Sequence, residues 1–125
     1  MKVAFTTITT NDLFNSLKFY KDIIGLTEFR RIKPQEGVQC VFFKDEKNSV
    51  IELIEYKNKV EANIENKESI VSIGFSVNNL DETIEMLKSN SIEIIRGPIE
   101  APGVKFVFVK DPNGVEVELI EGFDV

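Results

Sequence analysis

Histidine is absent from the 125-residue sequence. Its absence removes the commonest general base at neutral pH, and the commonest ligand of transition metals, from any mechanism for this chain. Cys40 is the only cysteine, which excludes an internal disulfide and a zinc site made of several cysteines. Because Cys40 adjoins Val41 and Phe42, we expect it to be a small buried side chain rather than a reactive thiol.

Long hydrophobic runs are also missing. No stretch is apolar for long enough to span a membrane, and Met1–Phe5 lead into a threonine-rich segment rather than a signal peptide. We therefore expect a cytoplasmic protein with no membrane partner.

Positive charge is scarce in the second half of the chain. The formal net charge is −6, and residues 61–125 carry five Lys or Arg against thirteen Asp or Glu, whereas residues 1–60 carry ten against eight. An acidic surface argues against nucleic acid as a partner. Two interpretations remain open: the acidity keeps the protein soluble, or it attracts a cationic ligand.

One stretch of the sequence occurs twice. Segments 44–55 and 110–121 have Lys, Asp, Glu, Leu, Ile and Glu at matching places, and each combines a polar turn with a β-rich run. Side chains alternate between the two faces of a strand. The repeat therefore places two equivalent carboxylates, Glu52 and Glu118, in mid-strand.

The residues before the first copy predict a strand, a helix and two further strands. Apolar residues from Leu13 to Ile24 recur at the spacing of one helix face, between the capping pair Asn11-Asp12 and a terminal Gly25. The predicted strands of this half are 3–10, 28–33, 38–43 and the strand of the first copy.

The same order begins again in the second half. Asn78 is expected to cap a helix that buries Leu80, Ile84 and Leu87. The predicted strands are 70–77, 92–95, 104–109 and the strand of the second copy, and 97–103 is predicted to be a loop.

The two copies of the repeat are 66 residues apart. A shift of 67 residues aligns the openings of the two halves, with Thr9 on Ser76 and Leu13 on Leu80. A long period present only twice indicates a duplicated βαβββ unit rather than a solenoid. The predicted fold class is α+β, in one domain with two modules whose mixed sheets curl into a cup, with the helices outside. We expect module 1 at about 1–57, a linker at about 58–68 and module 2 at about 69–125.

At this point the chain resembles the vicinal oxygen chelate superfamily, which is also called the glyoxalase, bleomycin-resistance and dioxygenase superfamily. The resemblance covers essentially the whole chain. It is carried by Asp12-Leu13, Ser16-Leu17-Lys18-Phe19-Tyr20, Gly25-Leu26, Asp111-Pro112-Asn113-Gly114 and Glu118-Leu119-Ile120-Glu121.

The resemblance implies a cup that holds a divalent metal. In proteins of that kind the ligands are His or Glu, one on the first and one on the last strand of each module. Carried across to this sequence, the four positions are Phe5, Glu52, Ser72 and Glu118. Both acids are present, but an aromatic ring and a hydroxyl replace the two histidines.

Three interpretations of Glu52 and Glu118 remain open. A hard ion such as Mg²⁺ could sit on the two carboxylates with several waters, although no cofactor is the simpler expectation. Without a metal, mutual repulsion would raise the pKa of one of them, and the pair could hold a cationic ligand or act as acid and base. Alternatively, the acids are solvated and have no ligand.

Strand parity adds further candidates for the wall of the cup, a mixed surface typical of small-molecule pockets. The candidate ligand-binding residues are Phe5, Thr7, Thr9, Val50, Ile54, Ser72, Gly74, Glu116 and Ile120, with Ser76 beside them. Arg30, Arg31, Arg96 and Lys105 could anchor an anion, and Phe42, Phe43, Phe106 and Phe108 could stack on a planar ligand.

The leading hypothesis is a metal-free, bleomycin-resistance-like protein that sequesters a small organic molecule, such as a drug or metabolite. We expect it to be a homodimer if a second chain completes the cup. The alternative is a lyase or isomerase similar to glyoxalase, in which Glu52 and Glu118, with or without a divalent metal, transfer a proton next to a carbonyl.

Overall fold

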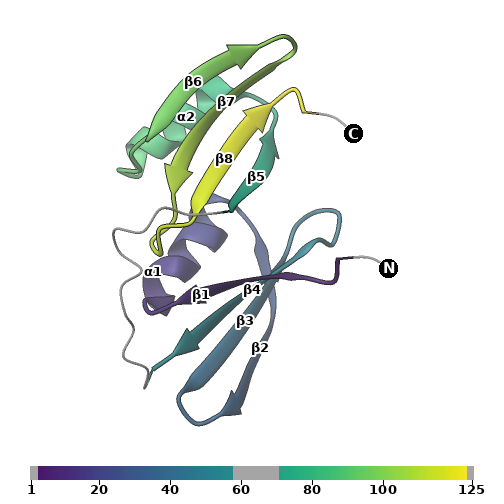
Figure 1. Cartoon of the computed structure of the whole chain (residues 1–125), viewed down its shortest axis with the longest axis vertical. Coiled ribbons are helices and arrows are strands. Elements are labelled where there is room, and N and C mark those ends of the chain that lie inside the picture. The colour runs from purple at the N-terminus through teal and green to yellow at the C-terminus, as the bar shows by residue number, and fades with distance from the viewer. Residues whose placement is uncertain (1–2, 58–70, 124–125) are drawn as a thin grey trace. The chain divides into compact units, whose positions relative to one another are not determined.

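The computed structural model describes residues 3–57 and 71–123, which form two compact units (Figure 1). We keep the names module 1 and module 2 for these two units. The predicted βαβββ order is confirmed in both. The predicted linker, about 58–68, lies outside the described residues.

Module 1 is a four-stranded sheet with one helical segment. Its strands lie in the order β1-β4-β3-β2, with β1 parallel to β4 and the other pairs antiparallel. Its elements are β1 (Thr6–Thr10), α1 (Leu13–Leu17), the π-helical segment η1 (Lys18–Ile23), β2 (Thr27–Gln35), β3 (Val38–Lys44) and β4 (Val50–Tyr56).

Module 2 repeats this topology in the order β5-β8-β7-β6, with β5 parallel to β8. Its elements are β5 (Ser72–Val77), α2 (Leu80–Ser89), β6 (Arg96–Ala101), β7 (Val104–Lys110) and β8 (Glu116–Glu121). None of the described helices is long and apolar enough to cross a membrane.

Each sheet has one buried and one open face. The buried faces carry alternate residues of the central strands, because strand side chains alternate with a period of two. In module 1 these are Ile8, Val41, Phe43, Ile51 and Leu53, with Phe19 and Tyr20 from η1; in module 2 they are Val107, Val109, Val117 and Leu119, with Leu80 and Leu87 from α2. The residues between them define what we call the open face of each sheet.

The helical segment of module 1 differs from the predicted single α-helix. It changes from α to π geometry at Lys18, and the wider turn alters which side chains point inward. Ser16, Phe19 and Tyr20 are buried, whereas Leu13 and Leu17 are only half-buried. Gly25 follows the segment with φ of +90°, as its predicted capping role requires.

Two sequence assignments in module 2 are wrong. Residues 92–95 form no strand, and the strand β6 occupies most of the predicted loop 97–103. Gly97-Pro98 suggested a turn, but it lies in β6, which is the edge strand of the sheet. Proline is tolerated there because the outer side of an edge strand has no neighbouring strand that needs an N–H donor. The register shifts between Arg96 and Ile99, which accommodates this pair.

The N-terminal cap of α2 is also one residue away from the predicted position. Asn79, rather than Asn78, accepts a hydrogen bond from the Glu82 N–H at 3.1 Å. In module 1 the predicted cap is confirmed, because Asp12 accepts from the Asn15 N–H at 3.1 Å.

Candidate functional site

The open face of module 2 collects five of the predicted site residues. Cross-strand pairing puts Ser72 beside Glu116, Gly74 beside Glu118 and Ser76 beside Ile120. The pairing of Gly74 with Glu118 continues across the sheet onto β7 and β6. Phe108 of β7 pairs with Glu118, and Arg96 of β6 pairs with Phe108. Gly74, Glu118, Phe108 and Arg96 therefore form one row across the sheet.

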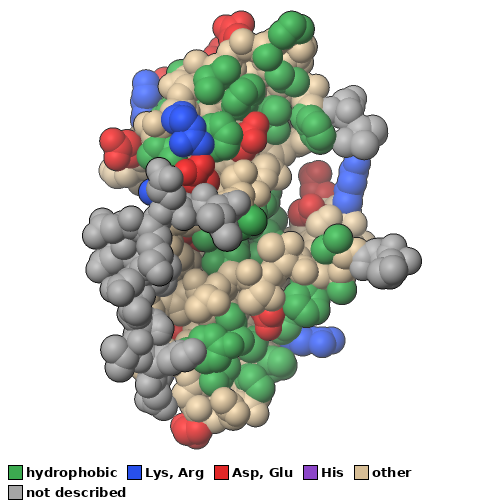
Figure 2. Space-filling model, in the orientation of Figure 1, with side chains coloured by type: hydrophobic (Ala, Val, Ile, Leu, Met, Phe, Trp, Pro, Cys, Tyr) green, Lys and Arg blue, Asp and Glu red, His purple; other side chains and the backbone are tan. Residues whose placement is uncertain are grey.

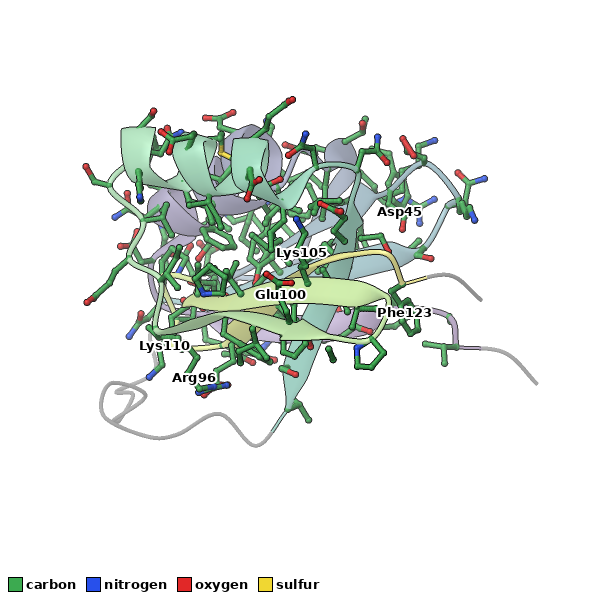
Figure 3. All side chains as sticks on the ribbon, turned by 90° about the horizontal axis from the view of Figure 1, so that it is seen from above. Asp45, Arg96, Glu100, Lys105, Lys110 and Phe123 are labelled. Atoms are coloured by element: carbon green, nitrogen blue, oxygen red, sulfur yellow. The ribbon has the colours of Figure 1, made fainter. Side chains whose placement is uncertain are left out.

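The surface of module 2 combines apolar and charged side chains. Hydrophobic side chains lie over the strands of module 2, with a few acidic and basic side chains among them (Figure 2). Arg96 lies on the side of the sheet away from α2, whereas Lys105 lies on the side of α2 (Figure 3). Arg96, but not Lys105, is therefore placed to contact a ligand on the open face.

The open face of module 1 holds the corresponding set. Thr7 pairs with Glu52 and Thr9 with Ile54, while Lys44 pairs with Val50 on the other side of β4. On β3, Cys40 pairs with Ile54 and Phe42 pairs with Glu52, so both have the parity of the open face, although the Cys40 side chain is buried.

Phe5 precedes β1 and is half-exposed, at 51%. Its ring meets the edge of Phe42 with centroids 6.2 Å apart and an interplanar angle of 89°. Phe29 also contacts Phe42, again at 6.2 Å. The residue at this family ligand position therefore belongs to an aromatic cluster.

Glu52 is held by its own module. The Thr7 hydroxyl donates a hydrogen bond to Glu52 Oε1 at 2.7 Å. Burial raises the pKa of the Cys40 thiol, and the neighbouring Glu52 carboxylate raises it further. Cys40 is 3% exposed, which confirms the prediction of a small buried side chain.

The other repeated acids have structural roles in both copies. Asp45 and Asp111 each accept two backbone N–H groups of the turn that they begin, at 2.8–2.9 Å and 2.8 Å respectively. Glu55 and Glu121 accept the first N–H of the helix in their own module, from Leu13 at 3.4 Å and Leu80 at 2.8 Å. These contacts explain why the sequence repeats those acids.

Glu118 has no such role. Among the residues that the structure describes, none forms a hydrogen bond or an ion pair with its carboxylate. The reason is local, because Gly74 occupies the place beside Glu118 that Thr7 occupies beside Glu52. The two equivalent acids of the repeat are therefore chemically unequal.

Contacts with Glu116 and Phe108 help to fix Arg96 on the open face of module 2. Its guanidinium pairs with Glu116 at 2.6 Å and lies 4.3 Å from the centroid of the Phe108 ring. Phe106 meets Phe108 edge to face, with centroids 5.9 Å apart. The sequence indicated Arg96 and both rings separately, but their contact depends on the pairing of β6 with β7.

The Arg96 hydrogen bond holds the pKa of Glu116 below its ordinary value. Because the pKa of Glu116 is lower in the folded than in the unfolded protein, ionised Glu116 adds to the free energy of unfolding. This contribution is fully present above the unfolded-state pKa, about 4.3, and is lost as the pH falls through the lower folded-state pKa. We therefore expect Arg96→Met to be less stable than wild type at neutral pH and to approach wild type in acid. Urea unfolding between pH 7 and 3 measures this, and a difference that does not shrink in acid would contradict the assignment.

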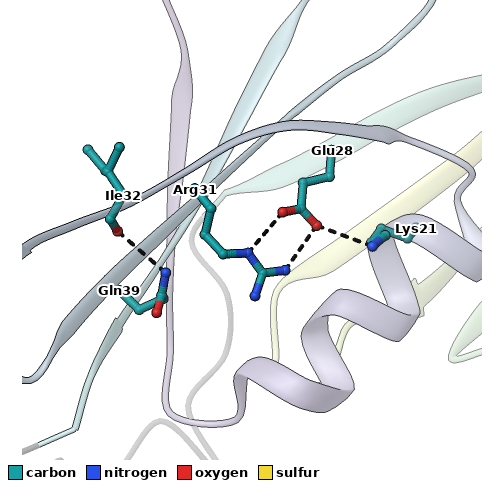
Figure 4. Close-up of polar contacts among 5 residues, drawn as sticks. All are labelled: Lys21, Glu28, Arg31, Ile32 and Gln39. Carbon is teal, nitrogen blue, oxygen red and sulfur yellow. Dashed lines mark hydrogen bonds and ion pairs between the residues drawn. The ribbon is translucent and has the colours of Figure 1, made fainter.

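Module 1 has a second charged surface beside η1, a depression lined by Lys21, Asp22, Leu26, Thr27, Glu28, Phe29, Arg30 and Arg31. Glu28 binds Arg31 at 2.9 Å and Lys21 at 3.2 Å (Figure 4). The Arg31 hydrogen bond is the main reason why the pKa of Glu28 lies below its ordinary value. Two of the three cations are thus already paired with Glu28, so the predicted anion site has little support here.

The residues at the four family ligand positions do not fit a transition metal. A phenyl ring cannot ligate, and Phe5 packs against Phe42. Glu52 already accepts a hydrogen bond from Thr7, and Ser72 offers only a neutral hydroxyl. The described part of the chain holds no cluster of three or more Asp, Glu or Cys side chains suited to a metal ion.

Two modules of one topology, each with a buried and an open sheet face, define a duplicated α+β fold. The chain belongs to the glyoxalase/bleomycin resistance protein/dioxygenase superfamily, whose family model matches residues 2–119. Lactoylglutathione lyase from Salmonella typhimurium is similar, at 29% identity over an alignment 130 residues long that covers 99% of this chain and 95% of that protein.

Solved structures show the same fold. Glyoxalase I of Leishmania major matches with a TM-score of 0.80 at 24% identity, covering 98% of this chain and 87% of its own. TnmS3, an antibiotic binding protein from Streptomyces sp. CB03234, matches with a TM-score of 0.76 at 14% identity, covering 98% and 97%. The fold therefore occurs both in an enzyme and in a binding protein, and the site must decide between them.

Proposed function

We propose that this protein binds a small organic molecule on the open sheet faces and sequesters it without converting it. The observation that carries this proposal is the position of Phe5. Where the family places a metal ligand, this chain has a ring packed on Phe42. Such a surface favours contact with an organic ligand over coordination of a metal ion.

The makeup of the open faces supports the same proposal. Module 2 offers the rings of Phe106 and Phe108, the small residues Ser72, Gly74 and Ser76, and a carboxylate at Glu118. Module 1 offers Phe5, Thr7, Thr9, Val50 and Ile54 around Glu52. We propose that each of these faces can contact a ligand, and that the protein acts in the cytoplasm as a homodimer, a state that light scattering can measure.

One observation favours a second candidate, a lyase of the lactoylglutathione type. The similar proteins with that name cover nearly the whole chain, and Glu118 has the free carboxylate that proton transfer next to a carbonyl would need. In this alternative Glu118 is the base, and Glu52 is a second carboxylate or, with a bound divalent metal, a ligand.

Two measurements separate the candidates. We expect no turnover of lactoylglutathione, and no rise in melting temperature with Mg²⁺, Mn²⁺, Ni²⁺ or Zn²⁺, because a ligand that binds only the folded state raises its stability. Turnover that is lost in Glu118→Gln would instead establish the lyase.

The binding proposal has its own test. We expect naphthylmethanol, a neutral planar probe, to bind saturably in calorimetry and to shift backbone amide signals of β7 and β8 in NMR spectra. Double substitution of Phe106 and Phe108 by leucine, which keeps the strands apolar, should weaken this binding because the rings that stack are lost. Absence of saturable binding by naphthylmethanol and by a charged naphthyl probe would contradict the proposal.

A further inference from the structure

We infer that Glu118 binds the cationic end of the ligand, a protonated amine carried on a planar aromatic body. This inference rests on the proposed function and names the chemical class of the ligand at that same site. Three properties of the open face of module 2 lead to it: its charge, its free space and its aromatic rings.

The basic side chains of this face are directed to Glu116 rather than to Glu118. Arg96 pairs with Glu116 at 2.6 Å, and Lys110, which is paired with Glu116 between β7 and β8, also acts on the Glu116 carboxylate. Glu118 lies two residues further along β8 and is half-buried. Within the described residues it has no basic partner. A partly desolvated carboxylate attracts a cation more strongly than one in bulk water, because the effective dielectric constant is lower.

Free space lies next to that carboxylate. A Cβ atom built on Gly74, directly across from Glu118, would meet nothing within 4 Å. In module 1 the equivalent place is filled by Thr7, whose hydroxyl binds Glu52 at 2.7 Å. The second module therefore leaves open, beside its acid, the place where the first module puts a hydrogen-bond donor.

The aromatic rings favour an organic cation over a metal ion. Phe108 flanks Glu118 on β7, and Phe106 meets Phe108 at its edge. A divalent ion needs several oxygen ligands, whereas the immediate strand neighbours of Glu118 in its row are Gly74 and Phe108. An ammonium group gains from the carboxylate, and its aromatic body can pack beside Phe106 and Phe108, where the Phe108 ring already holds the Arg96 guanidinium 4.3 Å from its centroid.

The test compares naphthylmethylamine with naphthylmethanol, which has the same ring and no charge. We expect the full-length protein to bind the amine about tenfold more tightly than the alcohol, the range of a charge-assisted hydrogen bond. Glu118→Gln should bring the ratio of the two affinities close to one. Glu93→Gln, at an exposed position between α2 and β6, removes the same charge elsewhere and should keep the ratio.

Gly74→Thr gives an independent test that keeps the carboxylate. The new hydroxyl should bind Glu118 as Thr7 binds Glu52, and the amine should lose most of its advantage. The space around Gly74 and the strand preference of threonine predict no loss of melting temperature. Gly74→Ala, which adds bulk without a donor, should lower the ratio less than Gly74→Thr.

The outcomes distinguish this inference from the proposed function. Saturable binding of both probes with a ratio near one in the wild type overturns the role of Glu118 and leaves small-molecule binding standing. A ratio that survives Glu118→Gln but is lost in Glu52→Gln assigns the cation to module 1 and also overturns it. Failure of both probes to bind contradicts the inference and the proposed function together.

Discussion

Gly122→Ala is expected to destabilise the protein by about 3 kcal/mol, from a positive φ and a backbone clash together. Gly122 follows β8 with φ of +94°, a conformation that costs an L-residue about 1–2 kcal/mol. A Cβ atom there would also overlap the carbonyl oxygen of Gly103, in the turn between β6 and β7. Because the obstructing atom belongs to the backbone, no side-chain rotation can relieve the overlap.

Gly25→Ala is the matched control for this prediction. Gly25 has nearly the same φ, +90°, but a Cβ atom there would meet nothing within 4 Å. Its substitution should therefore show only the conformational cost, about 1–2 kcal/mol. Urea unfolding of both variants measures the difference. Equal losses would mean that the backbone of Gly103 imposes no steric cost on a Cβ atom at residue 122.

Much of the fold followed from two properties of the sequence. The repeat predicted two modules of one order, and the alternation of apolar residues predicted which face of each central strand is buried. Val117 and Leu119 are buried and Glu118 is not, as the period of two requires. These predictions succeeded because the alternation of apolar and polar side chains along a strand indicates which face packs in the core.

The edge strand β6 was missed for a physical reason. Arg96–Ala101 is exposed at every residue, so it has no apolar alternation, and it contains Gly97-Pro98. Its strand conformation comes from pairing with β7, which lies downstream in the sequence. Local propensity does not include that contribution.

The difference between Glu52 and Glu118 was also missed, although the sequence contained a signal for it. Alignment of the openings of the two halves places Thr7 on Gly74, and these residues lie beside the two acids in the parallel strand pairs. Recognising the signal requires the register between the first and last strands of each module. A repeat predicts equivalent positions, but equivalent chemistry also depends on neighbours across the sheet. The prediction that Glu52 and Glu118 line one common cup remains to be tested by ligand binding to variants of both modules.

Asp111→Ala is expected to cost about 2 kcal/mol of stability, because two backbone N–H groups in a buried turn lose a charged acceptor. Asp111 is 5% exposed, and its Oδ1 accepts from the N–H groups of Asn113 and Val115, both at 2.8 Å. Asp45→Ala removes the same two kinds of bond from the equivalent turn in module 1. Asp45 is exposed, so water can replace the carboxylate there and the loss should stay at about 1 kcal/mol or less.

The turn at Asp111 also sets where β8 begins, and hence which face Glu118 occupies. A slip of one residue in this strand would move Glu118 to the buried face and Val117 to the open one. Asp111→Asn keeps an acceptor oxygen for both N–H groups and should recover about half of the lost stability, measured by urea unfolding. If Asp111→Ala and Asp45→Ala are equally mild, burial of the turn does not determine its contribution. The register of β8 must then be fixed by its pairing with β5 and β7 alone.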